Sequence, residues 1–208
     1  MLKVISFDVG GTLIKMSDTI FDIMPPQIKC FKNEIKNILY ITRKYTDKEE
    51  QQLLQFLSLQ QLDMLKKHYL QKKKEIIFPH MSGLLKQLSK HYKIIISSNR
   101  NCLSQNYVDF SKIENNIHSF FYSNEIGIVK NNPDFFIYCA DKLQVLPSEI
   151  LHIGDNVVTD FKIPLQAKCH AILWNNSLLN KSMEKLLTIL QEDNNKCQIG
   201  TKKINLQD

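Results

Sequence analysis

Polar side chains follow three apolar segments of this sequence, at the points where each segment is expected to end. Asp8, the pair Ser98-Asn99, and Asp155 each stand at the end of such a segment. Two carboxylates that meet repel each other unless a cation or a proton lies between them. Oxygen ligands of this kind suit Mg²⁺, which keeps several waters and binds one or two carboxylates together with substrate phosphate. The pattern therefore indicates a magnesium site, provided that the three segments converge.

The elements around these residues alternate between strands and helices. Strands are expected at 2–7, 93–97, 150–153 and 171–174, with helices such as 135–143 between them. Strands that alternate with helices of this length form βαβ units and a parallel sheet covered on both faces. In such a sheet the carboxyl ends of the strands gather along one edge, where ligands bind. The sequence thus predicts an α/β fold with its polar strand ends on one edge.

A helical segment, residues 15–78, separates the first strand from the rest of the pattern. Apolar residues at three- and four-residue spacings over 28–39 predict an amphipathic helix. Thr46 and Glu49 form a capping-box signature, which predicts the start of a second helix. A last helix is expected over 178–190, and the polar residues after it are typical of a linker or a frayed end. We interpret the segment 15–78 as an insertion into the α/β core.

The ordered set of motifs resembles the haloacid dehalogenase-like (HAD) superfamily over about residues 1–175. The resemblance implies a Rossmann-like parallel-sheet core formed by 1–14 and 79–191, a mobile α-helical cap formed by 15–78, and a polar tail or linker over 192–208. The segments similar to the four motifs of the family are Asp8-Val9-Gly10-Gly11-Thr12-Leu13, Ser98-Asn99, Lys130, and Gly154-Asp155 with Asp160.

The resemblance also implies a role for each matching residue. Asp8 would be the nucleophile that attacks phosphorus to give an aspartyl-phosphate, which water then hydrolyses. Lys130 would neutralise the phosphate and keep the nucleophile ionised, while the Ser98 hydroxyl would donate to the phosphoryl oxygens. The implied catalytic residues are Asp8, Ser98 and Lys130; the substrate-binding residues are Gly11, Ser98, Asn99 and Lys130; and the Mg²⁺-binding residues are Asp8, Gly10 through its carbonyl, Asp155 and Asp160.

One position departs from the phosphatase pattern of this family. The second residue after the nucleophile, usually an aspartate that acts as general acid, is Gly10 here. A positioned general acid is worth about 10²–10⁴-fold in rate, and alkyl alcohols need its proton more than a phenol, whose pKa is about 10. Gly10 therefore favours an aryl phosphate, such as phosphotyrosine in a protein, or another activated phosphate. Water or a residue of the cap is the alternative source of the proton.

Three other functions stay open: a small-molecule phosphomonoester phosphatase, a haloacid dehalogenase, and a non-catalytic HAD fold that binds a partner. Dehalogenases also lack the second aspartate, but they usually place an aromatic residue at the position of Gly10 and need a halide-binding arginine in the cap. Arg43 is the only arginine of the expected cap, and Arg100 follows the second motif. Because dehalogenases need no metal, Asp155 and Asp160 together favour the phosphatase. The intact catalytic set argues against a silent binding protein.

The charge balance is moderately basic. The 208 residues include 27 Lys or Arg and 21 Asp or Glu, which gives a net charge of +6. The densest basic run, 66–74, is expected on a helix, either as a solvated face or as a rim that attracts an anionic substrate or an acidic partner. Nucleic acid is not predicted as a partner, because the basic residues are not concentrated on one face with aromatic residues between them.

Several features bear on the location of the protein. Five scattered cysteines without a CxxC pair predict reduced thiols. No segment reaches the ~18 apolar residues of a membrane span, and the first residues do not resemble a signal peptide. We therefore expect a cytoplasmic protein. The superfamily includes effector protein-tyrosine phosphatases that intracellular bacterial pathogens deliver into host cells, so secretion without a cleaved signal peptide is a second hypothesis.

Overall fold

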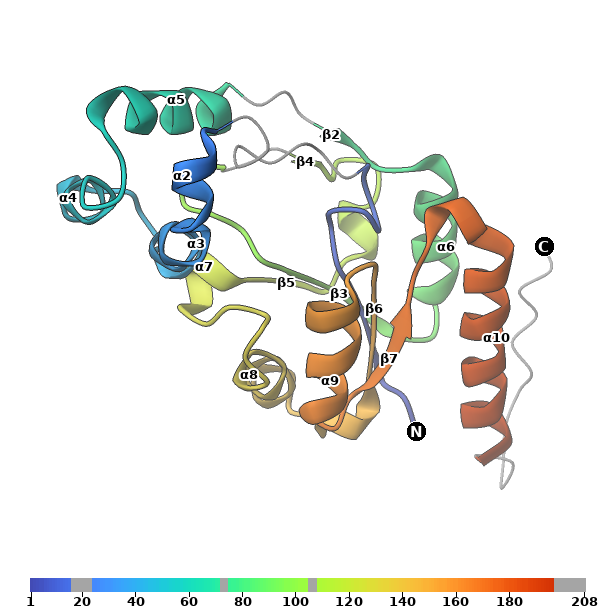
Figure 1. Ribbon diagram of the computed structural model, residues 1–208. Coiled ribbons are helices and arrows are strands. Elements are labelled where there is room, and N and C mark those ends of the chain that lie inside the picture. Colours follow the sequence, from blue (N-terminus) through green and yellow to red (C-terminus); the bar gives the residue numbers. More distant parts are fainter. Residues whose placement is uncertain (16–23, 72–74, 105–107, 197–208) are drawn as a thin grey trace.

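A five-stranded parallel sheet forms the centre of the fold (Figure 1). The computed structural model describes residues 1–15, 24–71, 75–104 and 108–196. In the order in which they lie side by side, the strands are β5 (Ser119–Tyr122), β3 (Lys93–Ser98), β1 (Val4–Phe7), β6 (Ile150–Gly154) and β7 (His170–Leu173). Phe7 of β1 pairs with Ile96 and Ile153 of its two neighbours. The residues that follow these three strands are therefore brought together, and the predicted α/β fold is confirmed.

Helices cover both faces of the sheet, because its central strands are apolar on both sides. Ile5 and Phe7 face the helices α6 and α10, and Val4 and Ile95 face α8 and α9. The bounds of these helices are α6 Pro79–Leu88, α8 Asp134–Leu143, α9 Ile163–Gln166 and α10 Leu179–Lys196. The two faces thus have separate hydrophobic clusters with the sheet between them.

Four further helices lie together at one end of the molecule (Figure 1). They share a third hydrophobic cluster, which Cys102 and Leu103 from the loop after β3 join. The Cys102 amide donates to the Leu39 carbonyl at 3.0 Å, so this loop ties the helices to the sheet. Their bounds are α2 Pro26–Lys29, α3 Lys32–Ile41, α4 Asp47–Leu53 and α5 Leu59–Leu70.

Short elements complete the described chain. Among them, β2 and β4 pair in parallel as a second, two-stranded sheet. Their bounds are β2 Glu75–Ile76, β4 Val108–Asp109, η1 Glu114–Asn116, α7 Ser123–Ile126, η2 Pro147–Glu149, the π-helical turn η3 Val157–Lys162, and η4 Asn176–Leu178. Within the described residues, no helix is both long and apolar enough to cross a membrane.

The structure differs from the sequence prediction in three places. The helix predicted over 28–39 is divided into α2 and α3, because Phe31 leaves the helical conformation at φ −98° and ψ 14°. The edge strand β5 and the small β2–β4 sheet were not predicted, since their pairing joins residues distant in sequence. Helix α10 continues to residue 196, beyond the predicted end at 190, and Asp193 on it accepts a hydrogen bond from the Leu2 amide at 2.8 Å. Residues 197–208 of the predicted tail lie outside the described residues.

Candidate active site

Asp8 lies just beyond the carboxyl end of β1, where the chain enters a tight turn, and its side chain is buried. The Leu13 amide closes the turn by donating to the Val9 carbonyl at 2.9 Å. Gly11 in this turn has a φ of +78°, and a Cβ there would lie 2.1 Å from Oδ2 of Asp155. Glycine both tolerates this backbone conformation and leaves room for the carboxylate. The turn therefore brings the first and fourth motifs into contact.

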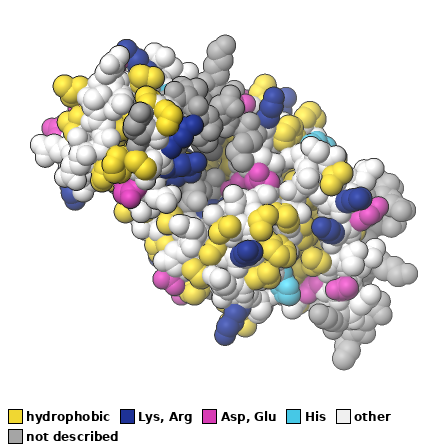
Figure 2. Space-filling model, viewed as in Figure 1, with side chains coloured by type: hydrophobic (Ala, Val, Ile, Leu, Met, Phe, Trp, Pro, Cys, Tyr) yellow, Lys and Arg dark blue, Asp and Glu magenta, His cyan; other side chains and the backbone are white. Residues whose placement is uncertain are grey.

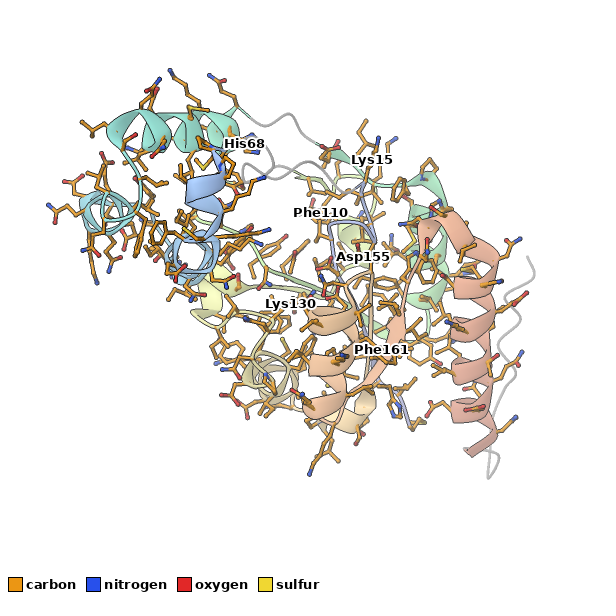
Figure 3. All side chains as sticks on the ribbon, viewed as in Figure 1. Lys15, His68, Phe110, Lys130, Asp155 and Phe161 are labelled. Atoms are coloured by element: carbon orange, nitrogen blue, oxygen red, sulfur yellow. The ribbon has the colours of Figure 1, made fainter. Side chains whose placement is uncertain are left out.

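Three carboxylates gather at this edge of the sheet. Oxygen atoms of Asp8, Asp155 and Asp160 lie within 4.8 Å of one another. Asp160 comes from the π-helical turn η3, where its Oδ2 accepts from the Asn156 amide at 2.9 Å. A Cβ on Gly154 would lie 2.4 Å from Cγ of Asp160, so the close approach of η3 to β6 also requires glycine. Figure 2 shows acidic side chains near the middle of the face that it presents, and Figure 3 labels Asp155.

Lys130 forms ion pairs with two of these carboxylates. Its side chain is buried, and Nζ lies 2.6 Å from Oδ1 of Asp8 and 2.5 Å from Oδ1 of Asp160. The Lys130 amide donates to Oδ1 of Asn99 at 2.8 Å, which attaches the loop before α8 to the end of β3. The ammonium group is thus held at a fixed position beside the carboxylate of Asp8.

Burial and these charges shift the pKa values of the site in different directions. Burial raises the pKa of Asp8 to about 7 against the opposing effect of Lys130, and Asp160 and Asp155 act in the same direction as burial. Burial also raises the pKa of Asp155. Burial would raise the pKa of Asp160 too, but Lys130 and His152 hold it well below its usual range. The two carboxylates likewise outweigh burial and keep the pKa of Lys130 above its ordinary value.

A buried chain of hydrogen bonds continues behind Asp160. Nε2 of His152 lies 3.1 Å from Oδ1 of Asp160, and Nδ1 lies 2.8 Å from Oγ of Ser6. Ser6 in turn is hydrogen-bonded to Ser97 at 2.8 Å. Burial lowers the pKa of His152 to about 4, with a contribution of the same sign from Lys130, so that the imidazole is neutral at pH 7. Because an ionised carboxylate only accepts, Nε2 carries the proton and Nδ1 accepts from the serine hydroxyl.

The sequence prediction did not include this series of buried hydrogen bonds. Ser6 and His152 are polar residues in the middle of the otherwise apolar strands β1 and β6, and they pair with each other across the sheet. Both are fully buried. Polar residues inside buried strands need hydrogen-bond partners, and that requirement is the signal by which the sequence could have revealed them.

The donor set fits a divalent cation. Three carboxylates face one ammonium group, so two negative charges are left over when all of them are ionised. Carboxylate oxygens are the ligands that Mg²⁺ prefers, and a cation of charge +2 would balance the cluster. Besides burial, which is the main cause, the neighbouring carboxylates Asp160 and Asp155 also raise the pKa of Asp8, in line with this excess of negative charge. The expected cofactor, Mg²⁺, therefore fits these residues.

The structure places the remaining predicted residues around this cluster. Ser98 ends β3 with a buried side chain, and its hydroxyl makes no hydrogen bond within the described part of the chain. Asn99 was predicted only to bind substrate, but its side-chain oxygen also accepts a hydrogen bond from the Lys130 backbone amide. Gly10 forms an isolated bridge with Ile14. Gly11 lies against Asp155 of the acidic cluster. The Gly10 carbonyl stays a predicted Mg²⁺ ligand, and the Ser98 hydroxyl stays a predicted donor to the substrate.

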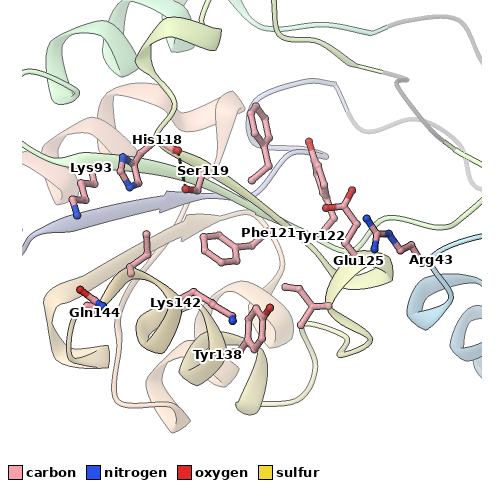
Figure 4. A pocket seen from close by; sticks show the side chains of 13 residues that line it. Arg43, Lys93, His118, Ser119, Phe121, Tyr122, Glu125, Tyr138, Lys142 and Gln144 are labelled. Carbon is pink, nitrogen blue, oxygen red and sulfur yellow. Dashed lines mark hydrogen bonds between the residues drawn. The ribbon is translucent and has the colours of Figure 1, made fainter.

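The two arginines considered for a dehalogenase lie elsewhere. Arg100 stacks on the Tyr122 ring, with its guanidinium carbon 3.7 Å from the ring centroid, and it forms an ion pair with Glu125. Arg43 lines a hollow of about 560 Å³ along β5 (Figure 4). The described lining of this hollow includes none of the three carboxylates. Neither arginine therefore has a contact with the acidic cluster in the described structure.

Comparisons with known proteins agree with this fold. The fold is similar to that of a predicted HAD-like family hydrolase from Porphyromonas gingivalis, with a TM-score of 0.63, 18% identity, and coverage of 90% of this chain and 98% of that one. It is similar to a HAD family enzyme from Bacteroides thetaiotaomicron in complex with magnesium and inorganic phosphate, with a TM-score of 0.56, 16% identity, and coverage of 83% and 94%. A 2-haloacid dehalogenase from Pseudomonas syringae pv. Tomato DC3000 gives a TM-score of 0.56 at 17% identity, with coverage of 84% and 86%.

At these identities the solved structures establish the fold and leave the reaction open. No curated protein matches the sequence. The family model of haloacid dehalogenase-like hydrolases, however, matches residues 2–167, which include all four motifs and the whole acidic cluster. On this match, and on the sheet whose strand ends carry Asp8 and Asp155, the chain belongs to the haloacid dehalogenase-like hydrolase family.

Proposed function

We propose that this hydrolase is a Mg²⁺-dependent phosphatase that forms an aspartyl-phosphate at Asp8 and favours aryl phosphates, such as phosphotyrosine in a protein. The observation that carries the proposal is the position of Asp8, whose carboxylate lies 2.6 Å from the buried ammonium of Lys130 in a cluster with two further carboxylates. A carboxylate held in this way can attack phosphorus while the ester oxygen leaves, and water then cleaves the acyl phosphate.

The surrounding residues take the roles that their positions allow. Lys130 would attract the phosphoryl oxygens and hold Asp8 in its ionised form once substrate is bound. Ser98 would direct its hydroxyl to the same oxygens, together with the backbone amide of Asn99, whereas the Gly11 amide already donates to the Ile14 carbonyl at 2.9 Å and Gly11 would bind substrate only by leaving room for it. Mg²⁺ would be held by Asp8, Asp155 and the Gly10 carbonyl, with Asp160 beside them. When bound, the cation supplies positive charge to the phosphoryl group.

The preference for aryl phosphates rests on Gly10. The residue two positions after Asp8 has no side chain, so it cannot protonate the leaving group. A phenolate leaves without that help far more easily than an alkoxide, because a phenol is the stronger acid. Phosphotyrosine in a protein is one biological substrate that meets this requirement, and the hypothesis of an effector that acts in a host cell depends on it.

The dehalogenase alternative is disfavoured by two observations. The Arg100 guanidinium stacks on Tyr122 and pairs with Glu125, and Arg43 lines the hollow of Figure 4, whose described lining includes none of the three carboxylates. In addition, the excess negative charge of the acidic cluster has no use in a reaction that needs no metal. The small-molecule phosphatase differs from the proposal only in its substrate, and the test below separates the two.

The test measures hydrolysis of p-nitrophenyl phosphate, a phosphotyrosine peptide, a phosphoserine peptide and a sugar phosphate, each with Mg²⁺ and with EDTA. We expect Mg²⁺-dependent turnover, with kcat/KM for the aryl esters higher by roughly 10²-fold or more. Asp8→Asn should abolish turnover, whereas Asp141→Asn, which makes the same change on an exposed residue of α8, should retain it. Hydrolysis that survives EDTA would contradict the dependence on Mg²⁺. Equal efficiency on aryl and alkyl esters would contradict the preference for aryl phosphates.

A further inference from the structure

A second hollow adjoins the acidic cluster. It has a volume of about 600 Å³, and its lining includes Gly11 and Asp155 of the candidate active site. We call it the lysine groove, because its lining includes Lys15, Lys181 and Lys185. Lys15 follows the turn after β1, and Figure 3 shows it on the same edge of the sheet as Asp155. The other two lysines come from α10.

The charges in the lysine groove are out of balance. Its described lining holds three lysines and a single carboxylate, Asp155, whose charge would be taken up by binding Mg²⁺. Among the described residues, none of the three lysines forms an ion pair, unlike Lys66 and Lys67 of the basic run predicted as a rim, which pair with Glu50 and Asp63. The lysine groove therefore carries unpaired positive charge beside the acidic cluster. The lysines that contribute this charge come from two segments that are distant in the sequence.

The position of Lys181 adds an independent argument. It is the third residue of α10, and the first turn of this 18-residue helix contains no acidic residue. The amino-terminal end of a helix carries a partial positive charge, which disfavours a lysine and favours an anion. A cation placed there is stabilised when an anion binds beside it. The wall of the groove is thus arranged for a negatively charged group.

Hydrogen bonds fix this wall to the catalytic turn. Nδ2 of Asn176 donates to the Gly11 carbonyl at 2.6 Å and to the Thr12 carbonyl at 3.2 Å. Oδ1 of Asn176 accepts from Nε1 of Trp174 at 3.0 Å. The chain before α10 is therefore joined directly to the turn after Asp8, so the groove and the acidic cluster keep a constant relative position. An extended ligand can use both sites at little extra cost in ordering.

We propose that the lysine groove binds a second anionic group of the substrate, a carboxylate or a phosphate located beside the phosphoryl ester that Asp8 attacks. This inference rests on the proposed phosphatase function and names its substrate class: a phosphate ester with a neighbouring negative charge. Two sources share this chemistry. One is a phosphotyrosine peptide with acidic residues next to the tyrosine, and the other is a small molecule that carries two phosphates.

Two pairs of substrates distinguish the sources. The first pair is a phosphotyrosine peptide flanked by glutamates and the same peptide flanked by glutamines. The second pair is a sugar bisphosphate and the corresponding monophosphate. We expect the doubly anionic member of one pair to have a kcat/KM higher by about fivefold, mainly through KM, since exposed charge pairs contribute modestly. This preference should shrink at high salt.

The variant that tests the groove is Lys181→Gln with Lys185→Gln, compared with Lys86→Gln and Lys90→Gln, which remove the same charge from exposed positions at the end of α6. The groove variant should bring the kcat/KM ratio within the preferred pair close to one, and the control variant should keep the wild-type ratio. Preference in the peptide pair assigns the acidic peptide, and preference in the sugar pair assigns the bisphosphate. No preference in either pair, or an equal loss of preference in the control, overturns the proposal.

A binding measurement separates the groove from the catalytic proposal. Fluorescence anisotropy of a fluorescein-labelled, glutamate-flanked phosphotyrosine peptide reports affinity without turnover, as does competition by the sugar bisphosphate. Weaker binding of the favoured ligand to the Lys181 and Lys185 variant than to the control supports the groove even if no substrate is hydrolysed, an outcome that would refute only the phosphatase. Hydrolysis with equal binding by both variants would refute only the groove.

Discussion

Magnesium binding to this protein should be coupled to the loss of a proton from Asp8. Burial raises the pKa of this carboxyl to about 7 in the metal-free protein, Asp160 and Asp155 add to the shift, and Lys130 opposes it. A cation binds only to the ionised carboxylate, so it must displace the proton when the pH is below that value. His152 does not titrate in this range, since its pKa is lowered to about 4.

The size of the effect follows from the pKa. With a single ionisation near 7, the dissociation constant for Mg²⁺ should be about thirtyfold larger at pH 5.5 than at pH 8.5. About one proton should be released per Mg²⁺ bound at pH 6, and almost none at pH 8.5. Because the pKa of Asp155 is also raised, its ionisation can only steepen the dependence at the acidic end.

Isothermal titration calorimetry of Mg²⁺ in pairs of buffers with different ionisation enthalpies measures both the affinity and the number of protons. The Asp8→Asn variant is the control: it should bind Mg²⁺ more weakly, and its affinity should change far less between pH 6 and 8.5. Equal wild-type affinity at pH 5.5 and 8.5, without proton release, would show that Lys130 outweighs burial and keeps Asp8 ionised. The reasoning from desolvation would then be wrong.

Three further changes probe the structure around the site. Lys130→Met leaves two buried carboxylates without their partner and should lower the free energy of unfolding by about 3–5 kcal/mol at neutral pH, as measured by urea denaturation; a loss below about 1 kcal/mol would contradict the geometry. Gly11→Ala introduces a Cβ where the φ is +78° and where the Asp155 carboxylate lies too close. We therefore expect a lower Tm and the loss of stabilisation by Mg²⁺ in thermal denaturation. Gly83→Ala, whose added Cβ meets no atom within 4 Å, is the control and should be tolerated. Thr46→Ala removes the capping box at the start of α4 and should cost about 1 kcal/mol without affecting the Mg²⁺ affinity, and an unchanged stability would show that this cap contributes nothing.

Much of the core could be predicted from the sequence because its signals are local. Short apolar segments that end in Asp8, Ser98 and Asp155 predict buried strands with polar ends, and the alternation with helices predicts a parallel sheet. The order of the motifs then indicates the family. The charge cluster follows as well, since parallel strands place their carboxyl ends on one edge of the sheet.

Other features depend on contacts between residues that are far apart in the chain. The strand β5 forms because β3 offers an unpaired edge to Ser119–Tyr122. Helices α2 and α3 are divided at Phe31, and both contribute side chains to one shared core. The longer α10 depends on the contact of Asp193 with the first residues of the chain. None of these contacts leaves a periodic signal in the segment itself.

The residue types of the site, the lack of a general acid at Gly10, and the strands that bring Asp8 and Asp155 to one edge can all be predicted from the sequence. The contact of Lys130 with two carboxylates, the hydrogen bonds from His152 and Ser6 that extend from Asp160, and the gathering of Lys15, Lys181 and Lys185 in one groove are visible only in the fold. Strand and turn signals arise from neighbouring residues, whereas burial, charge balance and shared hydrogen bonds arise only when distant segments pack together.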